Sequence, residues 1–370
     1  MARSVTGPRG LLRFALLVGA ACALLTLPAA GSAADPMPQP AGAATTSAPL
    51  ASPLPQAARI RLGDVGIAAS AGTYIAIEKG YFAEQGLDIE TVRFATTAEE
   101  TAPLAAGQLD AGSGVTSAGL FNAIGRGVDI KLVADQGHGE PGRPVNAFVV
   151  RRAGVEAGQL RSVADLRGRR VAVTSISTGA VTDVQAYLAQ GGLTINDVVI
   201  EQMGFPDMIP SLANGSVDAV VPVEPFTTLL EQSGVGTRWF WDSDVNPDHQ
   251  VAVILYGPTM VRDQPEVARR WMVAYLRGLR YFTDGFFRGN AAAREESIQV
   301  LMKWTAIRDR ALYDTMTVLG LDPNGDIRID SMRRDQEALL QLGQQDRPID
   351  LDAAVDMQYV RYAREVLGPY

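Results

Sequence analysis

The stretch that decides the fold runs from Asn214 to Phe226 and reads Asn-Gly-Ser-Val-Asp-Ala-Val-Val-Pro-Val-Glu-Pro-Phe. Asn214 and Gly215 tolerate the left-handed conformation that ends a helix. The residues from 216 to 221 are largely apolar and β-branched, which predicts a short buried strand. The prolines at 222 and 225 end that strand and hold Glu224 extended. The pattern therefore places a carboxylate at the carboxyl end of a buried strand, where α/β sheets bind ligands.

A second copy of this pattern lies earlier in the chain. Three pairs of segments match in the same order and at nearly constant spacing: 107–111 with 215–219, 85–87 with 191–193, and 70–73 with 177–180. Each copy holds a Ser/Gly loop that leads into a helix and a Gly-x-x-Asp-Ala entry into a strand. We expect Asp110 and Asp218 to cap and orient that entry rather than to touch a ligand. The repeat indicates two similar lobes.

From residue 59 onward, predicted strands alternate with helices of about ten residues, which predicts parallel, doubly wound sheets. The expected fold class is α/β with two lobes, each a doubly wound sheet, and two hinge crossings. We expect the strand 145–150 to make the first crossing and the strand 251–255 to make the return. Lobe I then comprises 59–149 and 256–370, and lobe II comprises 150–255. The chain after 265 is mostly helical, with Trp271 and Tyr275 expected in the core.

The repeat aligns Thr116-Ser117 with Glu224-Pro225 at equivalent strand ends of facing lobes. It also sets the loop 70–74 opposite the loop 175–179. Carboxyl strand ends and helix amino termini facing each other across a hinge form a closing trap for a small molecule. The expected ligand-binding residues are Ser70, Thr73, Tyr74, Thr116, Ser117, His138, Ser175, Ser177, Thr178, Gly179, Glu224 and Phe226.

The amino terminus is expected to lie outside the fold. Three arginines precede an apolar run from 14 to 27 and small residues from 29 to 34, which predicts a secretory signal peptide over 1–34. An uncleaved membrane anchor is the alternative. Cys22, the only cysteine, leaves open a lipid anchor or plain secretion. Residues 35–58 are mainly Pro, Ala, Ser and Thr, which predicts a disordered linker. The mature protein is therefore expected to be periplasmic or otherwise extracytoplasmic.

Charge and composition argue against several classes of function. The net charge is −8, and loss of the leader arginines makes the mature chain more acidic, so nucleic acid and anionic membranes are poor partners. His138 and His249 form no metal motif without cysteine partners. No phosphate-binding loop or nucleophile–base pair is visible. We expect a monomer that carries no metal and no cofactor.

Three segments resemble extracytoplasmic solute-binding proteins of ABC importers, in the nitrate, alkanesulfonate, taurine and thiamine-pyrimidine group. They are Glu78–Ile89 with Gly-Tyr-Phe at 80–82, Ser162–Ala172, and 215–219 with Glu224-Pro225. The resemblance covers 60–282 and implies a type II periplasmic-binding fold that delivers its ligand to a membrane permease with an ATPase. Val223 stands where many relatives carry an aromatic residue. A stacking surface is then either absent or supplied by Tyr74 or Phe226.

The candidate loops hold many neutral hydrogen-bonding groups and one firm acid, Glu224. A carboxylate in the pocket repels anions, whereas it accepts hydrogen bonds from a nitrogen heterocycle or amine. We therefore favour a pyrimidine-like or amine-bearing organic nutrient over a sulfonate, nitrate or aromatic acid. The other interpretation of Glu224 is that it secures the inter-lobe turn by hydrogen bonding.

Rival classes share the same scaffold. A pyrimidine synthase of the yeast type needs a cysteine-rich motif that this chain lacks, and a chorismate dehydratase works in the cytoplasm, against the leader. A sensory module would need a separate receptor. We expect a binding protein rather than an enzyme.

Overall fold

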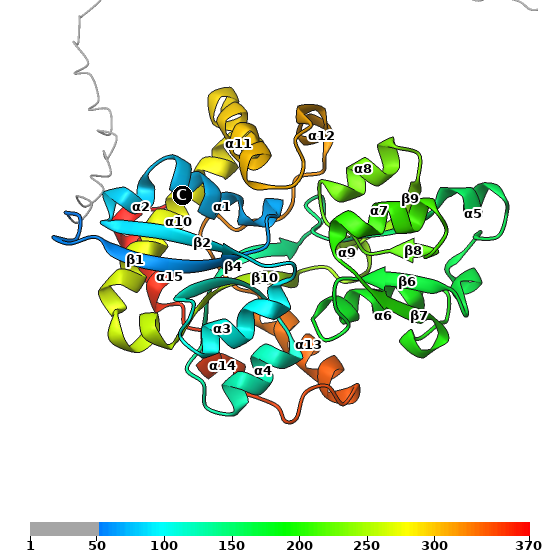
Figure 1. Cartoon of the computed structure of the whole chain (residues 1–370), viewed down its shortest axis with the longest axis horizontal. Helices are drawn as coiled ribbons and strands as arrows, with labels where there is room; N and C mark the ends of the chain where they lie inside the picture. The colour runs from blue at the N-terminus through cyan, green and yellow to red at the C-terminus, as the bar shows by residue number, and fades with distance from the viewer. Residues whose placement is uncertain (1–51) are drawn as a thin grey trace, which may run out of the picture. The chain divides into compact units, whose positions relative to one another are not determined.

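The structure, a computed structural model, describes residues 52–370, apart from the side chain of residue 98. The predicted signal peptide over 1–34, Cys22 and the linker up to residue 51 lie outside the described residues. From residue 58 onward the chain builds two five-stranded sheets, one in each lobe (Figure 1).

The sheet of lobe I has the order β2-β1-β3-β10-β4. Strands β1 to β3 are parallel, and β10 runs antiparallel between β3 and β4. Alternate residues of β10 face opposite sides: Ile254 and Tyr256 join one apolar cluster, and Val253 and Leu255 join another. The bounds are β1 Ala58–Asp64, β2 Leu87–Arg93, β3 Ala111–Val115, β4 Lys131–Gly139 and β10 His249–Tyr256.

The sheet of lobe II has the order β7-β6-β8-β5-β9. Strands β6, β7 and β8 are parallel, and β5 runs antiparallel between β8 and β9. Here too alternate residues serve two cores, since Phe148 and Val150 lie in one and Ala147 and Val149 in the other. The bounds are β5 Ala147–Arg151, β6 Arg170–Val173, β7 Val199–Gln202, β8 Ala219–Val220 and β9 Gly236–Trp241.

Both sheets are thus covered on two faces, which confirms the doubly wound α/β fold. The helices of the repeated units are α1 Ala71–Glu78, α2 Tyr81–Glu84, α3 Thr101–Ala105, α4 Ala118–Gly125, α5 Arg152–Glu156, α6 Ala180–Ala189, α7 Phe205–Ala213, α8 Phe226–Gln232 and α9 Asp242–Val245. The short 3₁₀ helices are η1 Ala68–Ser70, η2 Thr97–Glu100, η3 Val163–Leu166 and η4 Ile195–Asp197, and η5 Thr259–Asp263 is a π-helix.

The predicted repeat recurs as matching hydrogen bonds. Asp110 accepts a hydrogen bond from the amide of Arg61 at 2.8 Å, and Asp218 accepts one from the amide of Arg170 at 3.2 Å. The side chain of Arg61 also donates to the carbonyl of Gly107, which follows α3, at 2.8 Å. The side chain of Arg170 donates in the same way to the carbonyl of Gly215, which follows α7, at 3.0 Å. The expectation that these aspartates orient the strand entry is confirmed.

The sheet pairing shifts the predicted lobe boundaries. Strand β5, expected as the first crossing, pairs entirely within lobe II, and β10, expected as the return crossing inside lobe II, pairs within lobe I. The crossings are therefore the segments 140–146 and 242–248. Each sheet has one antiparallel strand, β5 or β10, that follows a crossing directly. The alternation of strands and helices along the sequence does not show which lobe such a strand joins.

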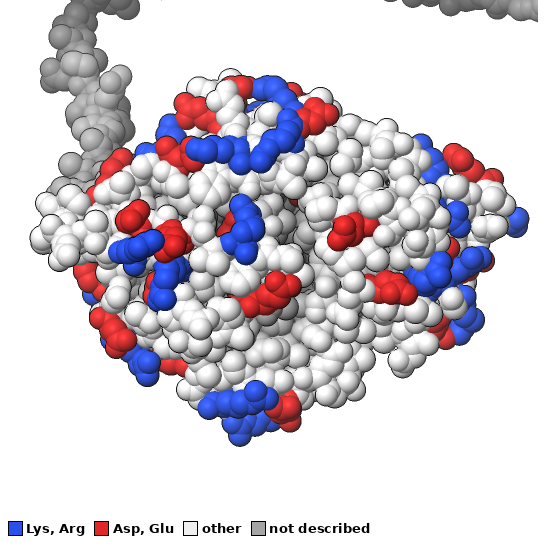
Figure 2. Space-filling model, in the orientation of Figure 1, with Lys and Arg blue, Asp and Glu red and all other residues white. Residues whose placement is uncertain are grey.

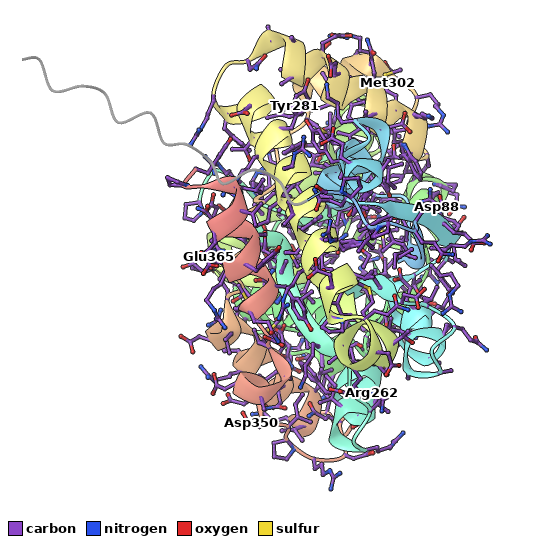
Figure 3. All side chains as sticks on the ribbon, turned by 90° about the vertical axis from the view of Figure 1, so that its left-hand side faces the viewer. Asp88, Arg262, Tyr281, Met302, Asp350 and Glu365 are labelled. Atoms are coloured by element: carbon purple, nitrogen blue, oxygen red, sulfur yellow. The ribbon has the colours of Figure 1, made fainter. Side chains whose placement is uncertain are left out.

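The C-terminal helices pack on lobe I, and α12 and α13 also contact α8 and α6 of lobe II. Figure 3 shows α10 running beside α15, with Tyr281 on α10 and Glu365 on α15. Trp271 and Tyr275 are fully buried in α10 and stack with ring centroids 5.2 Å apart, which confirms their place in the core. The bounds are α10 Pro265–Phe287, α11 Ala291–Trp304, α12 Arg310–Thr315, α13 Ile329–Gln341, α14 Leu351–Ala354 and α15 Gln358–Leu367.

Among the described helices, none is both long and apolar enough to span a membrane.

Candidate ligand-binding cleft

A small cavity lies between the carboxyl ends of the two sheets. Lobe I contributes the residues after β1 and β2, the end of β3 and part of β10, and lobe II contributes the residues after β6 and β8 and the starts of α6 and α7. The enclosed space is about 80 Å³, small beside the 300–1,000 Å³ of drug-sized sites. The lining residues are Val65, Ile67, Ala69, Ala95, Thr96, Thr97, Val115, Val145, Asn146, Thr174, Thr178, Ala180, Phe205, Val223, Val251 and Ala252.

No charged side chain is among these lining residues of the described chain. The wall is apolar except for four threonines and Asn146. Apolar walls with a few placed polar groups are typical of sites for small organic molecules.

Five of the predicted site residues bring the lobes together. The amide of Gly179 donates to the carbonyl of Thr116 at 2.7 Å, and the amide of Ala118 donates to the carbonyl of Ser177 at 2.9 Å. Ser117 and Thr178 form a β-bridge between the same loops. Thr178 is the predicted site residue that also lines the cavity. The loop 175–179 therefore contacts the loop after β3, whereas we had set it opposite the loop 70–74.

A glycine at 179 leaves the space in which these loops meet. A Cβ built there would lie 2.2 Å from Oγ1 of Thr116 and 2.3 Å from Oδ2 of Asp335. Ser175 supports the same loop, since its hydroxyl accepts a hydrogen bond from the amide of Ser177 at 3.2 Å.

Ser70, Thr73 and Tyr74 are buried within lobe I and do not line the cavity. The hydroxyls of Ser70 and Tyr74 donate to Asp64 at 3.0 and 2.6 Å. Tyr74 also stacks on Trp304, with 5.0 Å between ring centroids. Its phenol pKa is raised well above the usual value, by burial first and then by the charge of Asp64. These residues support the loop that carries Ile67 and Ala69 to the cavity.

Glu224 also lies outside the cavity lining, and it is 3% exposed. Its carboxylate accepts hydrogen bonds from the amide of Thr228 at 3.1 Å, the hydroxyl of Thr228 at 2.9 Å and the amide of Thr317 at 3.1 Å. Burial raises its pKa, and these three donors oppose the rise. The geometry matches the interpretation that Glu224 secures a turn between the lobes.

Phe226 stacks on Phe205, with 5.8 Å between ring centroids. Phe205, at the start of α7, forms the aromatic wall of the cavity, together with Val223. From the sequence, an aromatic surface is either absent or supplied by Tyr74 or Phe226, and Phe205 is not among the predicted site residues.

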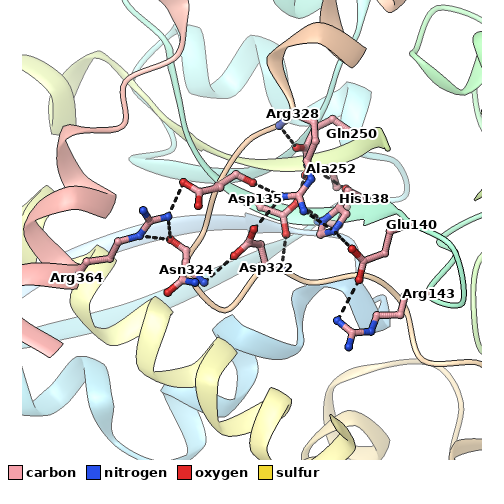
Figure 4. A network of polar contacts seen from close by, with 12 residues as sticks. Asp135, His138, Glu140, Arg143, Gln250, Ala252, Asp322, Asn324, Arg328 and Arg364 are labelled. Carbon is pink, nitrogen blue, oxygen red and sulfur yellow. Dashed lines mark hydrogen bonds and ion pairs between the residues drawn. The ribbon is translucent and has the colours of Figure 1, made fainter. Parts of the chain in front are cut away.

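His138 lies in a polar network inside lobe I rather than in the cavity (Figure 4). Nδ1 lies 3.1 Å from Asp135, and Nε2 lies 2.9 Å from the guanidinium of Arg328. Gln250 donates to Asp135 at 2.6 Å from the neighbouring strand. This network fixes the C-terminal segment to the ends of β4 and β10.

A second polar cluster joins the lobes behind the cavity. His249, at the start of β10, lies with Nδ1 2.8 Å from Asp183 of α6 and with Nε2 3.1 Å from Asp335 of α13. Burial lowers the pKa of His249, but these two carboxylates outweigh it and raise the pKa well above its usual value. Asp335 also accepts from the hydroxyls of Thr116 at 2.6 Å and Thr182 at 2.8 Å, one from each lobe.

Four lining residues that were not predicted from the sequence share one kind of position. Val65, Val115, Thr174 and Val223 stand at or just after the carboxyl ends of strands, where ligands bind in α/β sheets. The residues predicted from the sequence are mostly polar loop residues, and none of these four strand-end positions is among them.

On the face shown in Figure 2, basic and acidic side chains are interspersed, and neither sign forms a continuous patch. In the described part of the chain, no three His, Cys, Asp or Glu side chains are arranged to hold a metal ion.

A family model described as "NMT1/THI5 like" matches residues 68–284. The chain belongs to the NMT1/THI5-like family. A protein of Brucella abortus (strain 2308), named "Putative binding protein", is 25% identical to this NMT1/THI5-like chain over 245 residues, which cover 66% of the chain and 70% of the relative.

Solved structures of periplasmic binding proteins share the fold. The alkanesulfonate-binding protein SsuA from Xanthomonas axonopodis pv. citri, bound to MOPS, superposes with a TM-score of 0.65 at 17% identity over 82% of this chain and 99% of its own. The nitrate-binding protein NrtA from Synechocystis PCC 6803 superposes with a TM-score of 0.69 at 16% identity over 84% and 89%. The two-lobed type II fold is confirmed, and the family and these structural neighbours match the group of solute-binding proteins that the three sequence segments resemble.

Proposed function

We propose that this protein is the substrate-binding component of an ABC uptake system. It closes its two lobes on a small organic nutrient outside the cytoplasm and delivers it to a membrane permease driven by an ATPase. The family, the fold of the named binding proteins and the cavity at the meeting edges of two sheets support this proposal.

The proposed class of ligand follows from the absence of charged side chains among the described residues that line the cavity. A nitrate or sulfonate is bound by cations, backbone amides or hydroxyls. No cation of the described chain lines the cavity, and the first amide of α4 and the amide of Gly179 before α6 already donate to carbonyls of the opposite lobe, so binding of an anion would depend mainly on the threonine hydroxyls. We therefore favour a neutral or amino-bearing molecule, heteroaromatic compounds included, over an inorganic anion or a sulfonate. Phe205 supplies the aromatic surface for a flat ring.

Thermal-shift screening of the purified mature protein tests this function. Binding to the folded form raises its apparent stability. The panel holds pyrimidines, small lactams, amines, nitrate, alkanesulfonates and aromatic acids. Stabilisation by a neutral or amino-bearing compound, without its conversion, supports the proposal. Chemical turnover of that compound would show an enzyme instead, and stabilisation by anions alone would reverse the preference.

A further inference from the structure

We propose that the side-chain amide of Asn146 selects the ligand, by accepting a hydrogen bond from an N–H or O–H donor on an uncharged, largely apolar small molecule. This inference rests on the proposed function, because it assigns the class of ligand within the same cavity.

The orientation of the Asn146 amide is fixed by its neighbour. Nδ2 donates to Oδ2 of Asp183 at 2.8 Å, and both residues are buried. A carboxylate is an acceptor only, so the nitrogen has to be on that side. Asp183 is itself held by His249 Nδ1 at 2.8 Å and by Asn246 Nδ2 at 2.9 Å.

The amide oxygen of Asn146 is left to face a different direction, and no hydrogen bond to it comes from the residues the structure describes. Asn146 lines the cavity among apolar side chains. The amide oxygen is not among the described side-chain atoms that are both fully buried and without a partner, so it is accessible from the cavity. A ligand that covers it without offering a donor leaves this acceptor unpaired, at a cost in binding free energy.

The other polar groups of the lining cannot make the same distinction. They are hydroxyls of threonines at 96, 97, 174 and 178, which donate or accept as the ligand requires. An amide oxygen only accepts. Discrimination between a donor and an acceptor on the ligand is therefore assigned to Asn146.

The surroundings of Asn146 also disfavour anions. Its backbone amide lies 3.2 Å from Oδ2 of Asp242, so two buried carboxylates, Asp183 and Asp242, stand behind it. His249 lies between Asp183 and Asp335 rather than along the cavity wall. No cation from the part of the chain that the structure describes lines the cavity, so an anionic ligand at this position has no charged partner.

Matched pairs of shape-similar probes test the proposal on the intact mature protein. In 4-aminopyrimidine and 4-methylpyrimidine, an NH₂ is exchanged for a CH₃, and in 2-pyrrolidinone and cyclopentanone an N–H is exchanged for a CH₂. Titration calorimetry or ligand-observed NMR should show that the donor-bearing member of at least one pair binds about tenfold more tightly. Nitrate and methanesulfonate should bind less well than either donor.

Two variants locate the effect. Asn146→Leu should lose the preference for the donor. Asn246→Ala is the matched control, because Asn246 donates to the same Asp183 but does not line the cavity, and it should keep the preference. The wild-type comparison stands alone if Asn146→Leu fails to fold.

Equal affinity within both pairs, a preference that survives in Asn146→Leu, or tighter binding of the anions would overturn this inference while leaving a binding protein. A protein that binds no member of the wider panel, or that converts one, contradicts the proposed function as well.

Discussion

Glu224 connects the second lobe to the C-terminal part of the first. It follows β8 of lobe II, and its carboxylate accepts the amide hydrogen of Thr317, 93 residues further along the chain. Its two bonds to Thr228 close the first turn of α8. The residue therefore stabilises the arrangement of the lobes from a position outside the cavity.

Glu224→Ala should lower the free energy of unfolding by about 1–3 kcal/mol, because buried donors lose their acceptor. Glu224→Gln should cost less, since the amide oxygen still accepts. Burial raises the pKa of the folded carboxyl, so the folded state binds its proton more tightly, and wild-type stability should fall as the pH rises from about 4.3 through the raised value. Glu224→Gln should lose this part of the pH dependence.

Urea denaturation of the three proteins between pH 4 and pH 8 measures these differences, and probe binding is measured on the same samples. A Glu224→Ala protein of unchanged stability that no longer binds its ligand would place the carboxylate in the binding site, as the sequence had suggested.

The sequence could predict the strand-end position of Glu224 because the flanking prolines and apolar residues determine it locally. It could not identify Thr317 as a partner, since that contact depends on how the C-terminal segment packs. The same limit explains Tyr74, whose hydroxyl is taken by Asp64 inside lobe I. A polar side chain in a predicted loop does not reveal which of its neighbours satisfies it.

At the scale of elements, the start of α6 meets the loop that precedes α4. Gly179 donates to Thr116 and leaves no room for a Cβ beside Thr116 and Asp335. Its backbone is helical, with φ −56°, so an alanine would suit α6 taken alone. The requirement for glycine arises from the opposite lobe.

Gly179→Ala should therefore separate the lobes without unfolding either of them. We expect a larger radius of gyration by small-angle X-ray scattering and weaker binding of the best probe, with an unchanged far-ultraviolet circular dichroism spectrum. Gly119→Ala is the control, because a Cβ on this residue of α4 meets nothing within 4 Å. A compact Gly179→Ala protein with wild-type affinity would show that the loops adapt.

The repeat shows what the sequence predicts well at this scale. Gly107 and Gly215 have φ of 70° and 78° and precede the aspartates that orient β3 and β8, so a local pattern determines a local structure. The antiparallel strands β5 and β10 were misplaced because their lobe depends on long-range pairing. The sequence predicts a cavity at the strand ends, but it does not predict which residues form its apolar walls.

At the scale of the whole described fold, a histidine lies between two carboxylates where the lobes meet. His249 faces Asp183 on α6 and Asp335 on α13, with the hydroxyl of Thr182 at 3.4 Å and Asp242 close enough to interact with it. Burial and the neighbouring Asp183 raise the pKa of Asp242 to about 7. A protonated His249 offsets part of this negative charge, and so favours contact between the lobes.

His249→Gln should open the lobes at pH 6 to 7, since removing one partner of a buried ion pair costs about 3–5 kcal/mol.

In the wild type, the raised pKa of His249 means that its contribution is complete below about pH 6.5 and is lost as the pH rises through the raised value. Scattering measured from pH 6 upward should show opening only on the alkaline side. His138→Gln, which alters a network within lobe I, should not open the lobes. The double variant His249→Gln/Asp335→Asn should open less than His249→Gln alone, because one uncompensated carboxylate is gone. Equal or larger opening would show that His249 acts through packing rather than through its charge.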